Sequence, residues 1–359
     1  MIELNTFTTN IISIFKLYLQ TYVYKEISNF NAVNDNVTAV LGGGSSIKYY
    51  INDIDIPLKD FDIKICKKDL EDWKSFKSKG LLEENIDDYV KDILDLSIKR
   101  KEFINNLTSL LDSSKSSFIK FLKNTYNIEM EDIELSYYFE DVNLNIKDEV
   151  PKEYENIKKK LLLLDNSNFP RVTIIINFIY YLKTEFTKVR YGVKDEALFD
   201  IGLWTPLYLD ENLIEGVKNK NIELDKKEYS ILPIDNSIPY GFINRNFSYV
   251  RLEDNFCIVT ISYLIWDTVR MLCYSYSNNS NSAYEKYAKK YWLIIESLFN
   301  KLKCVSPFID ACTECSKDVS LKDQTYYINN ELNSYKSNMS SLFNNINTNE
   351  KKRIISSYY

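Results

Sequence analysis

Two short stretches near the amino terminus combine residue types that can bind a phosphate and a metal ion. Residues 42–46 read Gly-Gly-Gly-Ser-Ser, and residues 60–65 read Asp-Phe-Asp-Ile-Lys-Ile. Glycines let backbone N–H groups approach a phosphate closely, and a helix that begins at such a turn adds further free N–H groups. The two aspartates supply the oxygen ligands that Mg²⁺ prefers. Together, the stretches predict a site for a metal-bound triphosphate.

The apolar pattern predicts the elements that position these residues. Apolar side chains at helical spacing over residues 11–27 predict an opening helix, and residues 37–41 predict a strand that runs into the glycine turn. Residues 47–51 predict a short helix after the turn. Residues 61–65 alternate apolar and polar side chains, which predicts a strand with both aspartates on its polar face.

A third carboxylate is expected from a later strand. Residues 171–181 and 186–193 have strand patterns, and residues 198–204 predict a further strand around a single aspartate. Two divalent ions in a phosphoryl-transfer site need bridging carboxylates, and a neighbouring strand can complete the ligand set. The predicted metal ligands are Asp60, Asp62 and Asp200, and the residues predicted to contact the triphosphate are Gly43, Gly44, Ser45 and Ser46.

A second pair of aspartates, Asp53 and Asp55, competes for the metal-binding role. This pair is nearer to the glycines, but Pro57 ends any strand there early, whereas residues 61–65 sustain a buried strand. The later pair is therefore preferred, and the earlier pair remains the alternative. A run of glycine and serine alone is also typical of a flexible turn, so the neighbouring strands and aspartates carry the prediction.

Bulk composition limits the class of protein. The chain has 359 residues, of which 45% are hydrophobic, and it contains no histidine. The length favours two domains, and the absence of histidine excludes Ser-His and Cys-His nucleophile systems. A formal net charge of −6 argues against a protein that coats nucleic acid with its whole surface, but it is compatible with a local basic groove. No apolar segment reaches membrane-spanning length without charge, so no membrane contact is expected.

The cysteines and the later segments complete the expected organisation. Six cysteines without a secreted framework predict reduced thiols in the cytoplasm, and the spacing of Cys304, Cys312 and Cys315 is weak support for zinc. The expected fold class is α/β (α+β). The expected parts are a catalytic domain at residues 1–205 with a mostly helical, charged insertion at residues 69–165, a mainly helical second domain at residues 206–315, and a C-terminal helix and polar tail at residues 316–359.

The glycine turn and the strand of the paired aspartates resemble those of a known family. Residues 43–46 together with residues 60–62 look like the signature of the DNA polymerase β-type nucleotidyltransferase superfamily. Within it, the similarity is to the poly(A) polymerases of large cytoplasmic DNA viruses, of the mimivirus and African swine fever virus type. Residues 198–201 resemble the strand of the third carboxylate, and residues 266–272 and 286–291 resemble a helical region of those enzymes. The longer gap between the serines and the first aspartate departs from many members and implies an extra loop.

The resemblance implies a nucleotidyltransferase palm sheet and template-independent addition of AMP from ATP to RNA 3′ ends, as in mRNA processing, with two Mg²⁺ or Mn²⁺ ions. Further contacts to the nucleotide or RNA would come from Arg270, Lys286, Lys289 and Tyr287. Lysines at this helical spacing are equally typical of a solvated helix face. The resemblance also implies the cytoplasm of an infected cell, or a virion, as the location, and it is compatible with a homodimer.

Two alternatives stay open at this stage. Another enzyme of the same superfamily would transfer a nucleotide to a tRNA, a protein or a small molecule. A catalytically silent subunit would instead keep the fold to bind RNA or to act as a scaffold. Retention of all three candidate carboxylates argues against a silent subunit.

Overall fold

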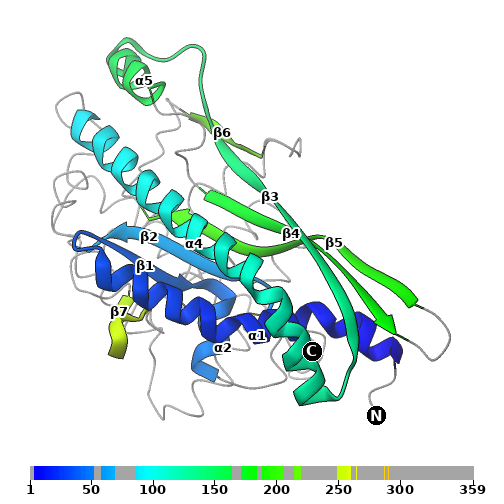
Figure 1. Cartoon of the computed structure of the whole chain (residues 1–359). Coiled ribbons are helices and arrows are strands. Elements are labelled where there is room, and N and C mark those ends of the chain that lie inside the picture. Colours follow the sequence, from blue (N-terminus) through cyan, green and yellow to red (C-terminus); the bar gives the residue numbers. More distant parts are fainter. Residues whose placement is uncertain are drawn as a thin grey trace, which may run out of the picture.

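Alternating apolar side chains build a mixed β-sheet with two long helices on one face (Figure 1). The computed structural model describes residues 4–51, 58–68, 86–163, 171–183, 188–204, 214–219 and 249–259, with Leu264, Tyr287 and Lys290. Its elements in chain order are α1 (Leu4–Val33), β1 (Val37–Gly42), α2 (Gly43–Ile51), β2 (Phe61–Lys67), α4 (Ile86–Tyr126), β3 (Met130–Ile146), η2 (Lys152–Tyr154), α5 (Glu155–Leu161), β4 (Arg171–Lys183), β5 (Lys188–Leu203), β6 (Ile214–Asn219), β7 (Tyr249–Arg251), η4 (Glu253–Asn255) and β8 (Cys257–Val259).

The described strands form one sheet in the order β6-β3-β4-β5-β2-β1-β8-β7. β2 is antiparallel to β1 but parallel to β5, and β4 is antiparallel to both β3 and β5. This arrangement confirms the predicted mixture of helices and sheet. It also places β2 and β5, which carry the predicted aspartates, next to each other near the centre of the sheet.

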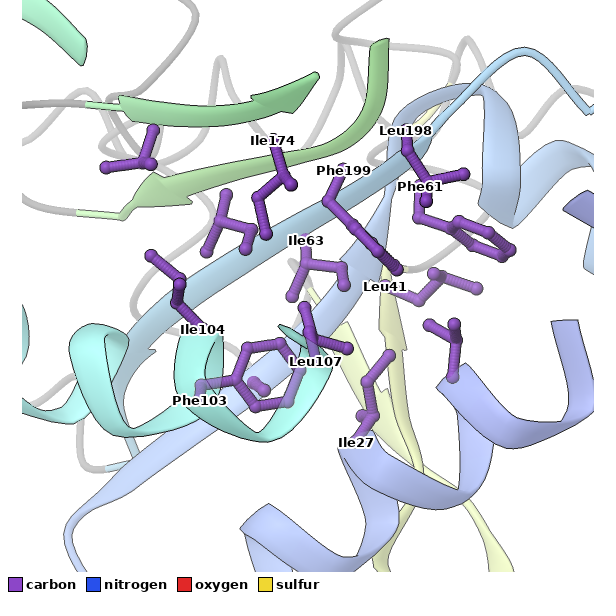
Figure 2. Packing of buried hydrophobic residues seen from close by; sticks show 14 of the residues in the cluster. Ile27, Leu41, Phe61, Ile63, Phe103, Ile104, Leu107, Ile174, Leu198 and Phe199 are labelled. Atoms are coloured by element: carbon purple, nitrogen blue, oxygen red, sulfur yellow. The ribbon is translucent and has the colours of Figure 1, made fainter. Parts of the chain in front are cut away.

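Helices α1 and α4 cover the same face of this sheet. The core-facing residues of α1 recur at helical spacing and have at most 1% of their surface exposed, namely Ile11, Phe15, Leu19, Val23 and Ile27. In Figure 2, Ile63 and Phe199 of the sheet point toward Leu107 of α4. Fully burying one such side chain contributes about 1.5–3 kcal/mol. The predicted opening helix is confirmed, and its apolar stripe is the surface that packs on the sheet.

A buried asparagine ties the end of α1 to the edge of β1. Asn31 is 1% exposed, and its amide nitrogen donates to the carbonyl oxygens of Ala39 at 2.9 Å and Asn255 at 3.0 Å. Its Oδ1 accepts from the Ala39 N–H at 2.7 Å and from the Thr38 hydroxyl at 3.0 Å. The side chain therefore pairs with the backbone of β1 much as a neighbouring strand would.

We expect Asn31→Leu to lower the free energy of unfolding by about 3 kcal/mol. Leucine has similar volume but leaves buried backbone groups without partners, at about 1–3 kcal/mol each before relaxation. Urea denaturation monitored by circular dichroism measures the change. Asn105→Leu, at an exposed position of α4, is the matched control and is expected to change stability by no more than about 0.5 kcal/mol. Equal effects of the two substitutions would contradict this account.

The prediction of a mostly helical insertion over residues 69–165 is wrong for residues 130–146. Residues 86–126 do form the long helix α4, but β3 follows as a 17-residue strand that pairs with β4 and β6. In β3, buried Ile133 and Leu135 alternate with exposed Glu134 and Ser136. This two-residue period marks a strand with one covered face. The dense charge of the segment hides that period, although β3 is a full strand of the sheet between β6 and β4.

Two other predictions need revision at the level of elements. Residues 186–193 and 198–204 were expected as separate strands, but residues 188–203 form the single strand β5, with register shifts along its pairing to β4. Residues 214–219 and 249–259 contribute β6, β7 and β8 to the sheet, which the expectation of a mainly helical domain at 206–315 did not include. Most of that predicted domain lies outside the described residues, so its mainly helical character stays a prediction. The predicted tail at residues 316–359 lies outside the described residues. Among the helices that are described, none is long and apolar enough to cross a bilayer.

Candidate active site

The register between β2 and β5 brings two of the predicted carboxylates together. Asp62 of β2 and Asp200 of β5 are Cα partners on adjacent parallel strands. Paired residues on neighbouring strands project from the same face of a sheet, and successive residues project from opposite faces. Phe61 and Phe199 face the helices, so the two aspartates lie on the opposite face of the sheet (Figure 2).

Buried side chains on the helix-covered face hold this register. The rings of Phe61 and Phe199 are stacked, with centroids 5.4 Å apart and an interplanar angle of 24°. The next pair in the same register is Ile63 with Ile201, and both side chains are fully buried. A slip of one residue would turn the apolar side chains outward and place the carboxylate of β2 in the core. Packing of the core therefore fixes the aspartates opposite each other.

The glycine turn lies on the other side of Asp62. Gly42, the last residue of β1, is the Cα partner of Asp62, and α2 begins at Gly43, which has a left-handed φ of +51°. The N–H of Gly44 donates to Oδ2 of Asp62 at 2.9 Å. A Cβ atom on Gly43 would lie 1.8 Å from that Oδ2 atom, so only glycine fits this turn. The carboxylate thus occupies the position that anions favour at a helix N-terminus.

The two serines of the turn bind the backbone. Ser45 Oγ donates to the Gly42 carbonyl at 2.8 Å and accepts from the Asp62 N–H at 3.2 Å. Ser46 Oγ donates to the Gly43 carbonyl at 2.8 Å, and both serine side chains are buried. These hydroxyls therefore fasten the turn to β2. The predicted contact between the serine hydroxyls and a triphosphate would require these bonds to break.

Tyrosines at the far end of α2 fix its direction. The Tyr50 hydroxyl donates to the carbonyl of Val259 at 2.8 Å, and the Tyr49 ring packs against Tyr24 and Phe256 with centroids 5.5 and 5.3 Å away. Burial raises the pKa of Tyr50 to about 12, so its hydroxyl stays a donor across the physiological range. With its C-terminal end held against β8, α2 directs its N-terminus at the aspartate of β2.

The remaining predicted site residues are placed only in part. Asp60 is half-buried and directly precedes β2, and Tyr287 is half-buried and packs against the core. The described residues contain no group of three or more Asp, Glu or Cys side chains arranged to hold a metal ion. The ligand set Asp60, Asp62 and Asp200 stays a prediction. The predicted residues that lie outside the described ranges are Arg270, Lys286, Lys289, Asp53, Asp55, Cys304, Cys312 and Cys315.

One cation on the aspartate face was not singled out from the sequence. Lys64 is half-buried, and its Cα partners are Val40 of β1 and Gly202 of β5. It projects from the same face as Asp62, and its Cγ lies 3.9 Å from where a Cβ on Gly42 would be. The alternation that revealed the aspartates also contains this lysine. The face therefore carries a positive charge beside its carboxylates.

Fold and site together define a class of arrangement: a mixed sheet in which paired aspartates on parallel strands adjoin a glycine turn at a helix N-terminus. Comparisons of the chain with protein-family models, with curated proteins and with solved structures found no match in any of the three. A functional assignment for this chain therefore depends on the geometry and chemistry of the site.

Proposed function

We propose that the protein transfers a nucleotide from a nucleoside triphosphate to an acceptor hydroxyl. The observation that carries this proposal is the pairing of Asp62 with Asp200 on adjacent strands, next to the N-terminus of α2. The pairing supplies two carboxylates on one rigid face, and the helix supplies N–H groups suited to phosphate oxygens. A third carboxylate, Asp60, precedes β2 by one residue.

The donor set fits hard divalent ions such as Mg²⁺ or Mn²⁺, because every proposed ligand atom is a carboxylate oxygen. Such ions, when bound, stabilise the negative charge on the attacking and leaving oxygens. In the proposed reaction the acceptor oxygen bonds to the α-phosphorus, and pyrophosphate leaves. Because the chain has no histidine, the proton of the attacking hydroxyl passes to one of the carboxylates. The glycine turn orients the phosphates once the Gly44 N–H exchanges its bond to Asp62 Oδ2 for one to a phosphate oxygen.

Within this reaction class, we propose ATP as the nucleotide and an RNA 3′ end as the acceptor, which makes the protein a poly(A) polymerase. The support for this narrower proposal is the sequence resemblance carried by residues 43–46, 60–62 and 198–201. The chemistry of the described site is the same for other acceptors. Nucleotide and acceptor must therefore be separated by assay.

Primer extension with the full chain tests both levels of the proposal. With Mg²⁺ or Mn²⁺, an RNA oligonucleotide and each nucleoside triphosphate in turn, we expect a ladder of products with ATP, and chelation by EDTA should abolish it. Parallel reactions offer tRNA, protein and small-molecule acceptors. Transfer to one of these and none to RNA would overturn the narrower proposal. No transfer to any acceptor with either metal would overturn the proposed reaction itself.

Paired substitutions test the choice between the two Asp-x-Asp pairs. We expect the double variant Asp60→Asn/Asp62→Asn to lose metal-dependent transfer, while Asp53→Asn/Asp55→Asn keeps it. Both variants lose two carboxylate charges, so each is a control for the other. The opposite pattern would transfer the metal-binding role to the earlier pair.

A further inference from the structure

A buried lysine connects α1 to β5 and to the chain segment just before β2. Lys16 has only 2% of its side chain exposed, and its ammonium nitrogen lies 2.5 Å from Oε1 of Glu196. The same nitrogen donates to the backbone carbonyl oxygen of Lys59. Glu196 is on β5, the strand of Asp200, and Lys59 directly precedes Asp60. One cation thus bonds to both chain segments that lead into the candidate site.

Burying the Lys16 ammonium in the core costs free energy, because the charged group loses its hydration. Lys16 follows Phe15 in the core-facing part of α1, where apolar side chains would pack without any loss of hydration. A buried ammonium is stabilised only when it is paired and hydrogen-bonded, and a well-packed apolar replacement is often at least as stable. Stability of the fold therefore does not explain a lysine at position 16. Its bonds to Glu196 and to the Lys59 carbonyl do.

The strand ladder does not extend to the first predicted metal ligand. Pairing of β2 with β5 begins at Phe61 and Phe199, so Asp60 lies just before the paired residues. Leu58, 3% exposed, and the Lys59 carbonyl fix the chain just ahead of Asp60. Ligand atoms must be held to within about 0.5 Å for a site to bind as built. The bond from Lys16 to the Lys59 carbonyl can hold the backbone next to Asp60 to that precision.

We propose that Lys16 is a positioning residue for metal binding: by bonding to the Lys59 carbonyl and to Glu196, it fixes Asp60 relative to β5 and Asp200. The inference depends on the proposed function, because it assigns Lys16 a purpose within the proposed metal site. Lys16 is on the helix-covered side of the sheet and acts through the backbone. Its removal should weaken metal binding even where the fold is retained.

Titration of the full chain with Mn²⁺, followed by electron paramagnetic resonance, tests the inference without relying on turnover. We expect Lys16→Met to weaken Mn²⁺ binding by about 10- to 100-fold, the range typical of residues that orient metal ligands. Lys16→Arg keeps the charge and the donors, and it should restore much of the affinity. Glu196→Gln keeps a side-chain oxygen that can accept from the Lys16 ammonium but loses the charge, so its Mn²⁺ affinity should fall less than that of Lys16→Met.

Asn31→Leu provides the structural control, because it removes buried hydrogen bonds to β1 and η4 and leaves the contacts of Lys16 intact. We expect it to lose stability while binding Mn²⁺ as the parent does. Hydrogen exchange of a peptide covering residues 58–62 should accelerate in Lys16→Met and not in this control. If Lys16→Met does not fold, Lys16→Gln replaces it, since the shorter amide does not reach both partners and should weaken binding as well.

The outcomes separate the two proposals. Equal Mn²⁺ affinity in the parent and in Lys16→Met or Lys16→Gln would overturn the inference alone. Equal weakening by Lys16→Met and Asn31→Leu would also overturn it, because the effect would then follow from lost stability. If the parent neither binds Mn²⁺ nor transfers nucleotides, the proposed function fails, and the role of Lys16 in metal binding fails with it.

Discussion

Asp62→Asn is expected to lower kcat for nucleotide transfer by about a thousandfold, equivalent to about 4 kcal/mol of transition-state stabilisation. The asparagine keeps an oxygen that can accept from the Gly44 N–H, so the turn and the strand should stay in place. It lacks the negative charge that a divalent ion requires. Single-turnover primer extension at saturating Mg²⁺ and ATP measures the loss.

Two controls accompany this substitution. Asp112→Asn removes the same charge from an exposed position of α4 and should leave kcat unchanged. The thermal midpoint of Asp62→Asn should stay near that of the parent protein. The loss of kcat would then come from the missing charge and not from a less stable fold. A variant that keeps more than about a tenth of parental kcat would remove Asp62 from the proposed ligand set, since a tenfold loss corresponds to only about 1.4 kcal/mol.

Asp200→Asn should lower kcat by a similar factor, and the losses of kcat from the two substitutions should not be additive in free energy. Carboxylates that hold the same ions act as a unit, so the double variant should be little worse than either single one. Effects that multiply fully would mean that the two aspartates act independently, although they are Cα partners.

Gly43→Ala is the second substitution with a large expected effect. The new Cβ would lie 1.8 Å from Oδ2 and 2.7 Å from Cβ of Asp62, so the backbone as well as the carboxylate must move. The left-handed φ of +51° adds about 1–2 kcal/mol of strain for any residue with a side chain. We expect kcat/KM to fall at least about a hundredfold, since displacing the carboxylate by an ångström costs about that much.

Gly44→Ala is the matched control for the turn. A Cβ on Gly44 meets no atom within 4 Å, and its φ is not in the left-handed region. Its free energy of unfolding should therefore change by about 0.5 kcal/mol or less, because alanine fits the backbone there. Urea denaturation of both variants measures the difference. If Gly43→Ala were as stable and as active as the parent, the close approach of turn and carboxylate would be unimportant.

Local patterns were sufficient to predict the elements around the candidate site. The strands β1 and β2 begin at their predicted residues and extend at most two residues further. The helix α1 contains its predicted core, residues 11–27, but begins at Leu4 and ends at Val33. The start of α2 was less clear, because glycines at a helix N-terminus look the same as glycines in a loop. These local patterns of apolar residues were sufficient to predict the α/β fold class.

The arrangement of the site could not be predicted from local signals. That Asp62 pairs with Asp200 depends on which strands lie next to each other and in which register, and both depend on contacts far apart in sequence. The strand β3 was missed because its charges outweighed its two-residue period. The interior position of Lys16 was hidden for a related reason, since a single lysine in an amphipathic helix ordinarily faces solvent.

The parallel pairing of β2 with β5 also bears on the order in which the protein folds. The hairpin of β4 and β5 and the pairing of β1 with β2 join segments close in sequence, whereas α4, β3 and β4 all lie between β2 and β5. Contacts with such a large sequence separation pay the loop-closure entropy before they gain any energy, so they form slowly. During refolding, helical circular dichroism should therefore recover before β5 docks along β2. The two aspartates meet only at that late step.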